Sequence, residues 1–593
     1  MSFIDNLSWS HGNHLAKFGV EVRPIRLYTD RLGGTTYTFS NLSEMLANQP
    51  AQIQFLGDLS APSPFNGGAT RIREGRQTYY IGYAQDEWKI RPNFTMSYGL
   101  RYEYYSVLRE ARNLAVVFRN GQLLPPTTPF LNSSKTNFAP RLAFTWAPGR
   151  FHNRTVLRVG AGYYYGPGQT EDQIQPIESD RVSTTLPPGS RYPIDPAAII
   201  RDYDINSPTL HYQPRAYLPG YRIPERVLSY SASIEQQLPW NSLLTVAYVG
   251  SQGRNLFLRS VTNLITGVAT DPDTGAAIIT RQYGDRFAEI DVKTSGGTDH
   301  YDSLQTSLNR RFSNGLTLGA QWTWGHSIGN SNGSNEARTA ANPYDFGADR
   351  GNNSFDIRHS FTLSSLYELP FGRGRAYLNH AGGVADAFFG GWRLGGLLNA
   401  RTGIPIEVLV TRNDVAYRDN RTGAVVNQPI LVNGRPVTTA IINTLGGGAS
   451  RGVRRPDVVA GVDPYLRDGT NFLNPAAFAM PAPGTFGNLG RNALHGPSFT
   501  QLDLTLTKQF PVTEKARLDF RVEVFNVLNQ ANFANPPSIL ANALGTDPNQ
   551  LQPGQPFTAA AGGGSFGVLN STVSRGLGLG ANRQIQFALR LSF

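Results

Sequence analysis

The last residues of the chain alternate strictly between apolar and polar side chains and end on an aromatic residue. Ile585, Phe587, Leu589, Leu591 and Phe593 share one parity, and Gln584, Gln586, Ala588, Arg590 and Ser592 share the other. Successive side chains of a strand point to opposite faces, so this pattern predicts a terminal β-strand with one apolar and one polar face. Such an end is difficult to cover in a soluble protein and is typical of a bacterial outer-membrane β-barrel, in which lipid covers the apolar face.

The same alternation recurs along the whole chain in segments of about ten residues. In RLDFRVEV, Leu518, Phe520, Val522 and Val524 oppose Arg517, Asp519, Arg521 and Glu523. Charged residues directly opposite an apolar face indicate a water-filled interior, because a soluble β-sandwich would place apolar residues inside and charges outside. The sequence therefore predicts an all-β protein, an antiparallel transmembrane β-barrel.

About fifteen strands are expected, and the connections between them alternate in length. The strands are placed near residues 3–9, 13–24, 78–90, 94–106, 137–147, 155–166, 226–238, 242–256, 300–312, 315–328, 355–370, 391–410, 498–510, 516–529 and 582–593. Tight turns such as 91–93, 239–241, 313–315 and 511–515 alternate with long connections such as 168–225 and 411–497. Short periplasmic turns and long extracellular loops are the expected construction of an outer-membrane barrel. The longer connection 371–391 departs from this rule, and VADAFFGGW within it predicts a short helix.

The composition agrees with this interpretation. Charged residues make up 16% of the chain, against about 25% in ordinary soluble domains. Aromatic residues reach 11%, and no run of 18 apolar residues predicts a membrane-spanning helix. The absence of cysteine excludes disulfides and thiolate metal sites. The net charge of +11 is spread along the chain and is interpreted as solvated loop charge rather than as a membrane-binding patch.

The first residues carry no recognisable signal peptide. An exported barrel with an odd number of strands is also unexpected, since single-chain bacterial barrels have even counts. We therefore expect the front of the barrel to lie upstream of the first residue.

No constellation of residues indicates catalysis, a cofactor, a metal centre or nucleic-acid binding. His11 and His14 are the only closely spaced histidines, and no HExxH motif occurs. The segments 202–206 and 271–275 resemble the start of calcium loops but lack Glu at the twelfth position, so ordinary turns explain them better. The chain is expected not to be an enzyme, and a soluble secreted β-rich enzyme is the least favoured alternative.

Residues 211–226 are the best candidate for ligand contact outside the cell. Their tyrosines and arginines offer stacking and positive charge toward a peptide or glycan, and the candidates are Tyr212, Tyr217, Tyr221 and Arg222. A role in the aromatic girdle or in loop packing is the alternative, and we favour it over ligand contact.

Several motifs resemble the β-barrel of TonB-dependent transporters, specifically the Oar-like group. The resemblance covers essentially the whole chain, in the expected order. Its motifs are HLAKFGVEVR (14–23), YAQDEWKIRPNFTMSYGLRYE (83–103), NFAPRLAFTWAP (137–148), SFDIRHSFTLSSLYELPFG (354–372), GWRLGGLLNARTGIPI (391–406), NPAAFAMPAPGTFGNLGRNALHGPSFTQLDLTLTKQF (474–510) and RLDFRVEVFNVLNQANF (517–533).

The resemblance implies a 22-stranded barrel closed by an N-terminal plug, of which residues 1–593 form the C-terminal portion as one domain. The plug, the TonB box and about seven strands have no counterpart here. It further implies an assembly signal at Phe593, Leu591 and Leu589, read by the barrel-insertion machinery. The implied function is TonB-dependent uptake or passage of an unidentified ligand across the bacterial outer membrane, with outer-membrane lipid and the TonB system as partners. A non-energised pore or an adhesin-like barrel is the alternative.

Overall fold

The fold is known from a computed structural model of the chain. It describes residues 2–29, 36–39, 41–56, 73–112, 118–119, 122–124, 132–151, 154–168, 181–186, 188–195, 210–212, 215–218, 220–263, 265–273, 277–284, 290–313, 315–331, 340–343, 345–410, 415–418, 425–428, 431–432, 435–436, 455–481, 486–511, 513, 516–540, 555–558, 564–573 and 582–593.

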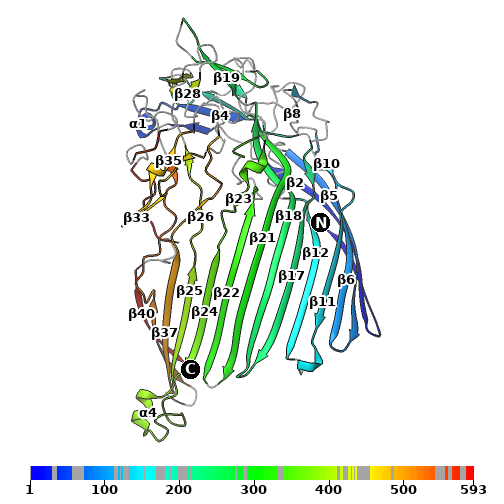
Figure 1. The fold of residues 1–593 in the computed structure, drawn as a ribbon, viewed down its shortest axis with the longest axis vertical. Helices are drawn as coiled ribbons and strands as arrows, with labels where there is room; N and C mark the ends of the chain where they lie inside the picture. Colours follow the sequence, from blue (N-terminus) through cyan, green and yellow to red (C-terminus); the bar gives the residue numbers. More distant parts are fainter. Residues whose placement is uncertain are drawn as a thin grey trace.

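Fifteen long strands form a tall curved wall (Figure 1). All fifteen predicted strands are confirmed, in the predicted order. They are β1 (Phe3–His11), β2 (His14–Thr29), β5 (Arg73–Arg91), β6 (Phe94–Tyr105), β11 (Phe138–Trp146), β12 (Thr155–Gly166), β17 (Glu225–Leu238), β18 (Ser242–Thr262), β21 (Ile290–Ser313), β22 (Leu316–Gly329), β24 (His359–Glu368), β25 (Trp392–Arg401), β37 (Phe499–Pro511), β38 (Arg517–Phe525) and β40 (Gln584–Ser592).

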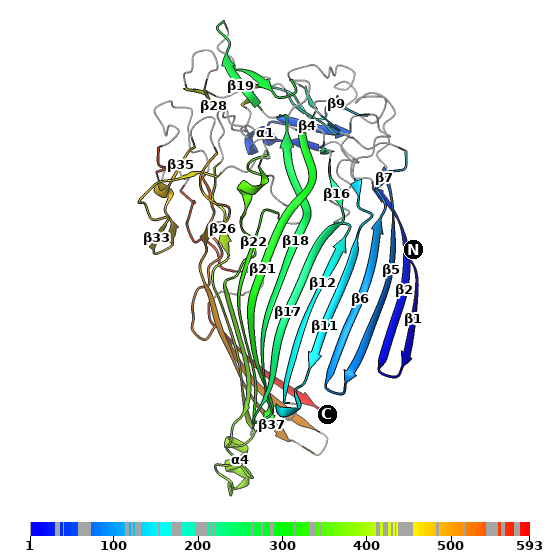
Figure 2. The same cartoon turned by 45° about the vertical axis from the view of Figure 1, so that its right-hand side comes forward.

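Consecutive long strands pair antiparallel, so the wall is a meander. Three short strands, β7 (Arg109–Glu110), β15 (Arg215–Tyr217) and β23 (Gly351–Asn352), extend it to an 18-stranded sheet. Within the described part of the chain, β1 pairs only with β2 and β40 only with β38. The sheet is therefore open between its first and last strands, as Figure 2 shows.

The two ends of the wall differ as the sequence predicts. One end carries tight turns: Trp240 and Asn241, between β17 and β18, both adopt positive φ, which matches the twist of a hairpin. We call this the turn end. The other end, the loop end, carries the long connections (Figures 1 and 2). The short helix expected near residue 384 is present as α4 (Gly383–Phe389), at the turn end between β24 and β25.

The long connections contain a short helix and short strands, and the strands pair with one another. These elements include α1 (Leu42–Leu46), β3 (Thr36–Thr38), β4 (Gln52–Leu56), β13 (Arg181–Thr185), β14 (Leu210–Tyr212), β19 (Ile265–Thr270), β20 (Ala277–Arg281), β26 (Pro405–Ile406), β27 (Leu409–Val410), β32 (Asp457–Val458), β35 (Phe478–Ala479), β36 (Leu494–His495) and β39 (Ile539–Leu540). None of the helices in the described ranges is both long and apolar enough to cross a membrane.

Both buried apolar clusters lie at the loop end, one within the long connections and the other where connection residues meet the loop-end parts of β5, β6, β15 and β18. One cluster gathers residues of 406–410 and 473–494 with Leu540, Phe557 and Phe566. The other gathers Tyr79, Tyr105, Leu108, Tyr217, Tyr221, Ile223 and Phe257. In contrast, Leu589 and Ile585 on β40 are 68% and 58% exposed. The two apolar clusters described here are therefore at the loop end, whereas the apolar side chains of the last strand are exposed.

A buried ion pair joins two of the long connections. Arg455 contacts the carboxylate of Asp349 and lies 3.3 Å from Oε1 of Glu407, and all three side chains are nearly inaccessible to solvent. Asp349 also accepts a hydrogen bond from the backbone N–H of Ala341, so its buried carboxylate has a second polar partner besides Arg455. This network ties the connection after β22 to the connection after β25.

Candidate functional site

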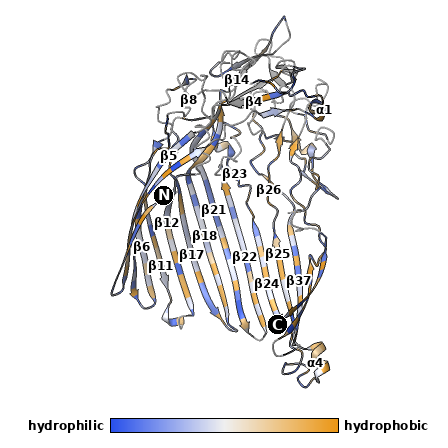
Figure 3. Cartoon of the chain, turned by 180° about the vertical axis from the view of Figure 1, so that it is seen from behind, coloured by the Kyte–Doolittle hydropathy of each residue, from blue (hydrophilic) through white to orange (hydrophobic). Residues whose placement is uncertain are grey.

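The register of the sheet sorts the wall residues into two faces. One cross-strand row runs through Tyr98, Leu142, Ala161 and Tyr230, and the next runs through Gly99, Arg141, Gly162 and Ser229. The first row belongs to an apolar face and the second to a polar face. Figure 3 shows the resulting alternation of hydropathy along single strands.

A groove of about 590 Å³ lies on the polar face and crosses seven strands from β5 to β21. Each stretch of lining residues begins and ends on a residue of the polar face, which identifies that face as the concave one. The stretches are 83–87, 97–101, 141–143, 160–162 with Tyr164, 229–231, 249–251 and Tyr301.

Small residues form the floor of this groove. On the polar face, β6, β11, β12, β17 and β18 contribute Ser97, Gly99, Ala143, Gly160, Gly162, Ser229, Ser231 and Ser251. At Gly162 the absence of a side chain is required, because a Cβ atom there would lie 2.9 Å from Cγ of Arg141. Arg141 stands among these small residues, and where they lie a ligand or another polypeptide can approach the backbone closely.

Charged and aromatic side chains stand beside the floor. The guanidinium of Arg141 lies 4.3 Å from the centre of the Tyr164 ring. Nε of Arg101 lies 2.6 Å from Oε1 of Glu103. The Tyr83 hydroxyl donates to Oδ1 of Asn6 on β1, at 2.8 Å. This arrangement can bind by hydrogen bonds, stacking and charge, and the side chains described around it contain no nucleophile activated by a neighbouring base.

A smaller hollow of about 350 Å³ lies toward the loop end of the same face, on β24, β25 and β37. Its polar lining includes Thr362, Asn399, Arg401, Gln501 and Asp503. Nε2 of Gln501 donates to Asp503, and the guanidinium of Arg401 lies 5.4 Å from the centre of the Phe499 ring. The concave face is therefore hydrogen-bonding and mixed in charge over much of its extent.

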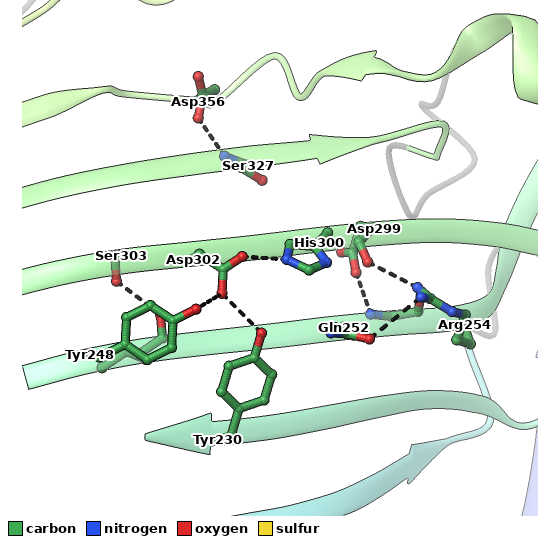
Figure 4. Close-up of polar contacts among 12 residues, drawn as sticks. Tyr230, Tyr248, Gln252, Arg254, Asp299, His300, Asp302, Ser303, Ser327 and Asp356 are labelled. Carbon is green, nitrogen blue, oxygen red and sulfur yellow. Dashed lines mark hydrogen bonds and ion pairs between the residues drawn. The ribbon is translucent and has the colours of Figure 1, made fainter. Parts of the chain in front are cut away.

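The opposite, convex face also carries polar clusters: Asp86 contacts His14 and Tyr98 there, and a second carboxylate, Asp302, is drawn in Figure 4. Asp302 on β21 accepts hydrogen bonds from Tyr248 on β18 and Tyr230 on β17, and Nε2 of His300 contacts its second oxygen. Leu304 and Trp324 lie on the same face, next to Asp302 and His326. Asp302 is thus a carboxylate on the apolar face whose two oxygens are both hydrogen-bonded.

The predicted ligand-contact residues fall in different environments. Tyr217 and Tyr221 are 1% and 3% exposed and stack on one another with ring centres 5.6 Å apart. Arg222 is exposed, and its backbone N–H donates to Ser295. Tyr212 ends β14, and its side chain lies outside the described residues. The packing role that we favoured therefore describes the two buried rings, and a role in ligand contact stays a prediction for the set.

The three residues of the expected assembly signal lie on or beside the last strand. Leu589 and Leu591 belong to β40 and pair with Phe520 and Leu518, and Phe593 follows the strand with its side chain 98% exposed. All three have the parity of the apolar face. Their position is as the sequence predicts, and their role in assembly is untested.

The histidines and aspartates considered as metal ligands make ordinary contacts where the structure describes them. His11 and His14 pair across the first hairpin, where His11 stacks on Trp9 and Nδ1 of His14 lies 2.7 Å from Asp86. Asp271 accepts from the backbone of Asp273, as in an ordinary turn. The segment 202–206 lies outside the described residues. Across the ranges that the structure describes, no group of three His, Cys, Asp or Glu residues could hold a metal ion.

Sequence reasoning did not identify the groove or the Asp302 cluster. The groove collects residues from 83 to 301 of the sequence, and only the register places them together. A signal was present at Asp302, since it is a carboxylate at an apolar parity position between His300 and Leu304.

Comparison with known proteins gives one family match and several structural ones. Residues 1–586 match the model of the outer membrane beta barrel domain. A search of curated proteins finds no match. Similar solved structures include the outer membrane transporter YddB from Escherichia coli, at 10% identity and a TM-score of 0.47, with 100% of this chain and 53% of that one covered. Another is the FrpB iron transporter from Neisseria meningitidis, at 10% identity and a TM-score of 0.42, with coverages of 99% and 54%.

The ferric-catecholate import receptor Fiu from Escherichia coli K12 is also similar, at 12% identity and a TM-score of 0.36, with 94% of this chain and 53% of that one covered. The chain thus spans about half the length of the solved structures that it matches. The family match extends over nearly the whole sequence, from the first strand of the wall into the last. The chain belongs to the outer membrane beta barrel domain family, and its wall crosses the bacterial outer membrane with the turn end in the periplasm and the loop end outside the cell.

Proposed function

We propose that the chain forms the wall and outer loops of a transporter that moves an unidentified ligand across the outer membrane by TonB-dependent uptake. The single observation that carries this proposal is the small-floored groove on the concave face, bordered by Arg101, Arg141 and Tyr164. A wall with a purely structural role needs no such surface. A wall that lines a passage, or that binds a segment which gates the passage, does need one. The outward-facing loops with their own packed clusters are the place for ligand choice.

Several finer parts of this proposal rest on the resemblance stated above. We assign the chain to the Oar-like group, with residues 1–593 as the C-terminal portion of a 22-stranded barrel whose plug and TonB box precede them. We assign Phe593, Leu591 and Leu589 to recognition by the barrel-insertion machinery. We place Tyr212, Tyr217, Tyr221 and Arg222 near the ligand path, and we infer that the chain is not an enzyme.

The test is a blockade of the concave face by single cysteines, which is simple because the chain has no cysteine. Ser231 on the groove floor and Ala232, its neighbour on the apolar face, form a matched pair. Each is changed to Cys in the protein expressed from its gene, and cells are treated with a bulky, membrane-impermeant maleimide. We expect Ser231→Cys to be labelled and ligand uptake to fall, and Ala232→Cys to remain unlabelled and active.

Energy dependence separates the two transport hypotheses. Uptake that stops when a protonophore collapses the inner-membrane potential supports the TonB-dependent transporter. Uptake that continues unchanged supports the non-energised pore. Equal labelling of both cysteines, or normal uptake after complete labelling of Ser231→Cys, contradicts the role of the groove.

A further inference from the structure

The connection between β24 and β25 presents an apolar surface at the periplasmic end of the wall. Within it, Val384, Phe388 and Phe389 of α4 are 76%, 69% and 58% exposed. Tyr377, Leu378 and Phe371 in the same connection are exposed as well. Figures 1 and 3 show α4 beyond the ends of the strands, and Figure 3 shows it as largely hydrophobic. Exposed apolar groups of this density need a partner.

The helix is oriented by its only acidic residue. Oδ1 of Asp386 accepts a hydrogen bond from the backbone N–H of Arg373 at 2.6 Å, so this side of α4 faces its own connection. At 100° per residue, Val384, Ala385, Phe388 and Phe389 form an arc that lies away from Asp386. The apolar arc is therefore turned outward by a specific contact.

The end of α4 is attached to the lipid-facing side of the wall. Nε1 of Trp392 donates to the carbonyl of Phe388 at 2.8 Å. Trp392 begins β25 and pairs with Lys508, in the row that continues to Phe520 and Leu589 on the apolar face. The apolar surface of α4 is thus continuous with the band that contacts lipid.

Lys508 lies at this attachment, near the end of β37. Its ammonium donates to the carbonyl of Gly390, directly after α4, and lies 5.2 Å from the centre of the Trp392 ring and 5.1 Å from that of Phe510. A lysine among aromatic rings at the end of an apolar band is the usual composition of a membrane–water interface. Arg373 is exposed nearby, and the ion pairs described around this connection join Glu368 to Arg375 and Arg393.

We propose that residues 371–392 form an interfacial anchor whose α4 inserts Val384, Phe388 and Phe389 into the periplasmic leaflet, with Arg373 beside anionic phospholipid headgroups. The occupant of the apolar arc is therefore phospholipid. Its chemistry fits because the surface combines apolar and aromatic side chains with positive charge and joins the lipid-facing band. This anchor fixes the height of the β24–β25 hairpin and is independent of the ligand that the barrel transports.

Single cysteines test the anchor in the whole protein reconstituted into vesicles. Phe388→Cys carries an environment-sensitive fluorophore, and Asn379→Cys, an exposed polar position of the same connection, is the matched control. We expect a blue-shifted emission and quenching by brominated acyl chains for the label at 388, with little quenching by aqueous iodide. We expect the label at 379 to show no blue shift, little quenching by brominated acyl chains and strong quenching by aqueous iodide. Heat-modifiable migration on gels confirms that both variants are folded.

Lipid composition distinguishes the contributions of charge and apolar contact. One set of vesicles contains about one third phosphatidylglycerol, and the other contains zwitterionic lipid alone. We expect the label at 388 to be buried more deeply in the first set, and Arg373→Gln should reduce this difference. Iodide quenching at 388 equal to that at 379 in both vesicle types overturns the proposal. A blue shift that arises only after a periplasmic protein fraction is added also overturns it, because the occupant would then be a protein.

Discussion

The hydroxyl of Tyr230 on β17 donates to Oδ1 of Asp302 on β21 at 2.9 Å, although β18 lies between the two strands. The contact is possible because the residue between them in the same row is Gly250. The Tyr230 ring lies across this glycine, and a Cβ atom there would be 2.3 Å from the ring. The same construction occurs on the concave face, where Tyr83 crosses Gly19 to reach Asn6. In both places one aromatic ring links three strands.

This relationship predicts that Gly250→Ala destabilises the wall. The new methyl group would displace the Tyr230 ring and approach Oδ1 of Asp302 to 2.7 Å. Overpacking of this kind costs about 1–3 kcal/mol. Gly82→Ala on β5 is the control, because a Cβ atom there meets nothing within 4 Å. Urea unfolding in vesicles measures the difference, and equal stability of the two variants would show that the ring contact contributes nothing.

The buried arginine at the loop end makes a second prediction. Arg455→Met leaves the carboxylates of Asp349 and Glu407 buried without their cation, which costs about 3–5 kcal/mol. Because the network joins two loops, the expected readout is faster protease cleavage outside the cell with the wall still heat-modifiable. The control is Arg521→Gln, which breaks an exposed pair 3.3 Å long and worth about 0–1 kcal/mol. Unchanged proteolysis of Arg455→Met would contradict the proposed link.

His495 in β36 predicts that the long connections at the loop end become less stable in acid. Burial, and then the neighbouring Arg358 guanidinium, hold the pKa of His495 below its ordinary value. The unfolded state therefore binds a proton more readily than the folded state. The stability contributed by neutral His495 is complete above about pH 6.5, the ordinary value, and it is lost as the pH falls toward the lowered pKa.

Limited proteolysis between pH 7.5 and pH 5.5 measures this effect. The His495 backbone makes two hydrogen bonds with the Tyr465 hydroxyl, so the loop position does not depend on the imidazole alone. His495→Gln should therefore fold and show a weaker dependence on pH. An identical pH profile in both proteins would assign the acid sensitivity to other groups.

Measurements of stability distinguish two of the four ligand-contact candidates, Tyr221 and Arg222. Tyr221→Ala removes a buried ring from the cluster with Tyr217 and Phe257, and we expect a loss of about 3–5 kcal/mol. Arg222→Ala changes an exposed side chain and should alter stability by less than about 0.5 kcal/mol. A loss of ligand uptake in a stable Arg222→Ala protein supports ligand contact, and full uptake removes Arg222 from the ligand path.

The terminal aromatic residue predicts an effect on assembly rather than on the finished fold. Phe593 is almost fully exposed and follows the last strand, so its deletion removes little packing. If the insertion machinery reads it, deletion should remove most of the heat-modifiable protein from cells while refolding from urea into detergent proceeds normally. Ser592→Ala is the control, since Ser592 has the opposite parity. Normal assembly without Phe593 would remove the residue from the signal.

The sequence alone determined the strands, their faces and the two unlike ends of the wall. Alternation of side chains is local and has a period of two, so Leu518 to Val524 already show which residues face lipid. The helix near Val384 was also legible, whereas its outward apolar arc depends on the hydrogen bond from Arg373 to Asp386.

Only the tertiary structure decided which residues meet across strands. Tyr230, Gly250 and Asp302 come from three strands, and the groove joins residues more than 200 positions apart. Register depends on the pairing of whole strands, and a shift of one residue would exchange every face. For the same reason the burial of Tyr217 and Tyr221 could not be read from 211–226, because their partner Phe257 lies on a different strand.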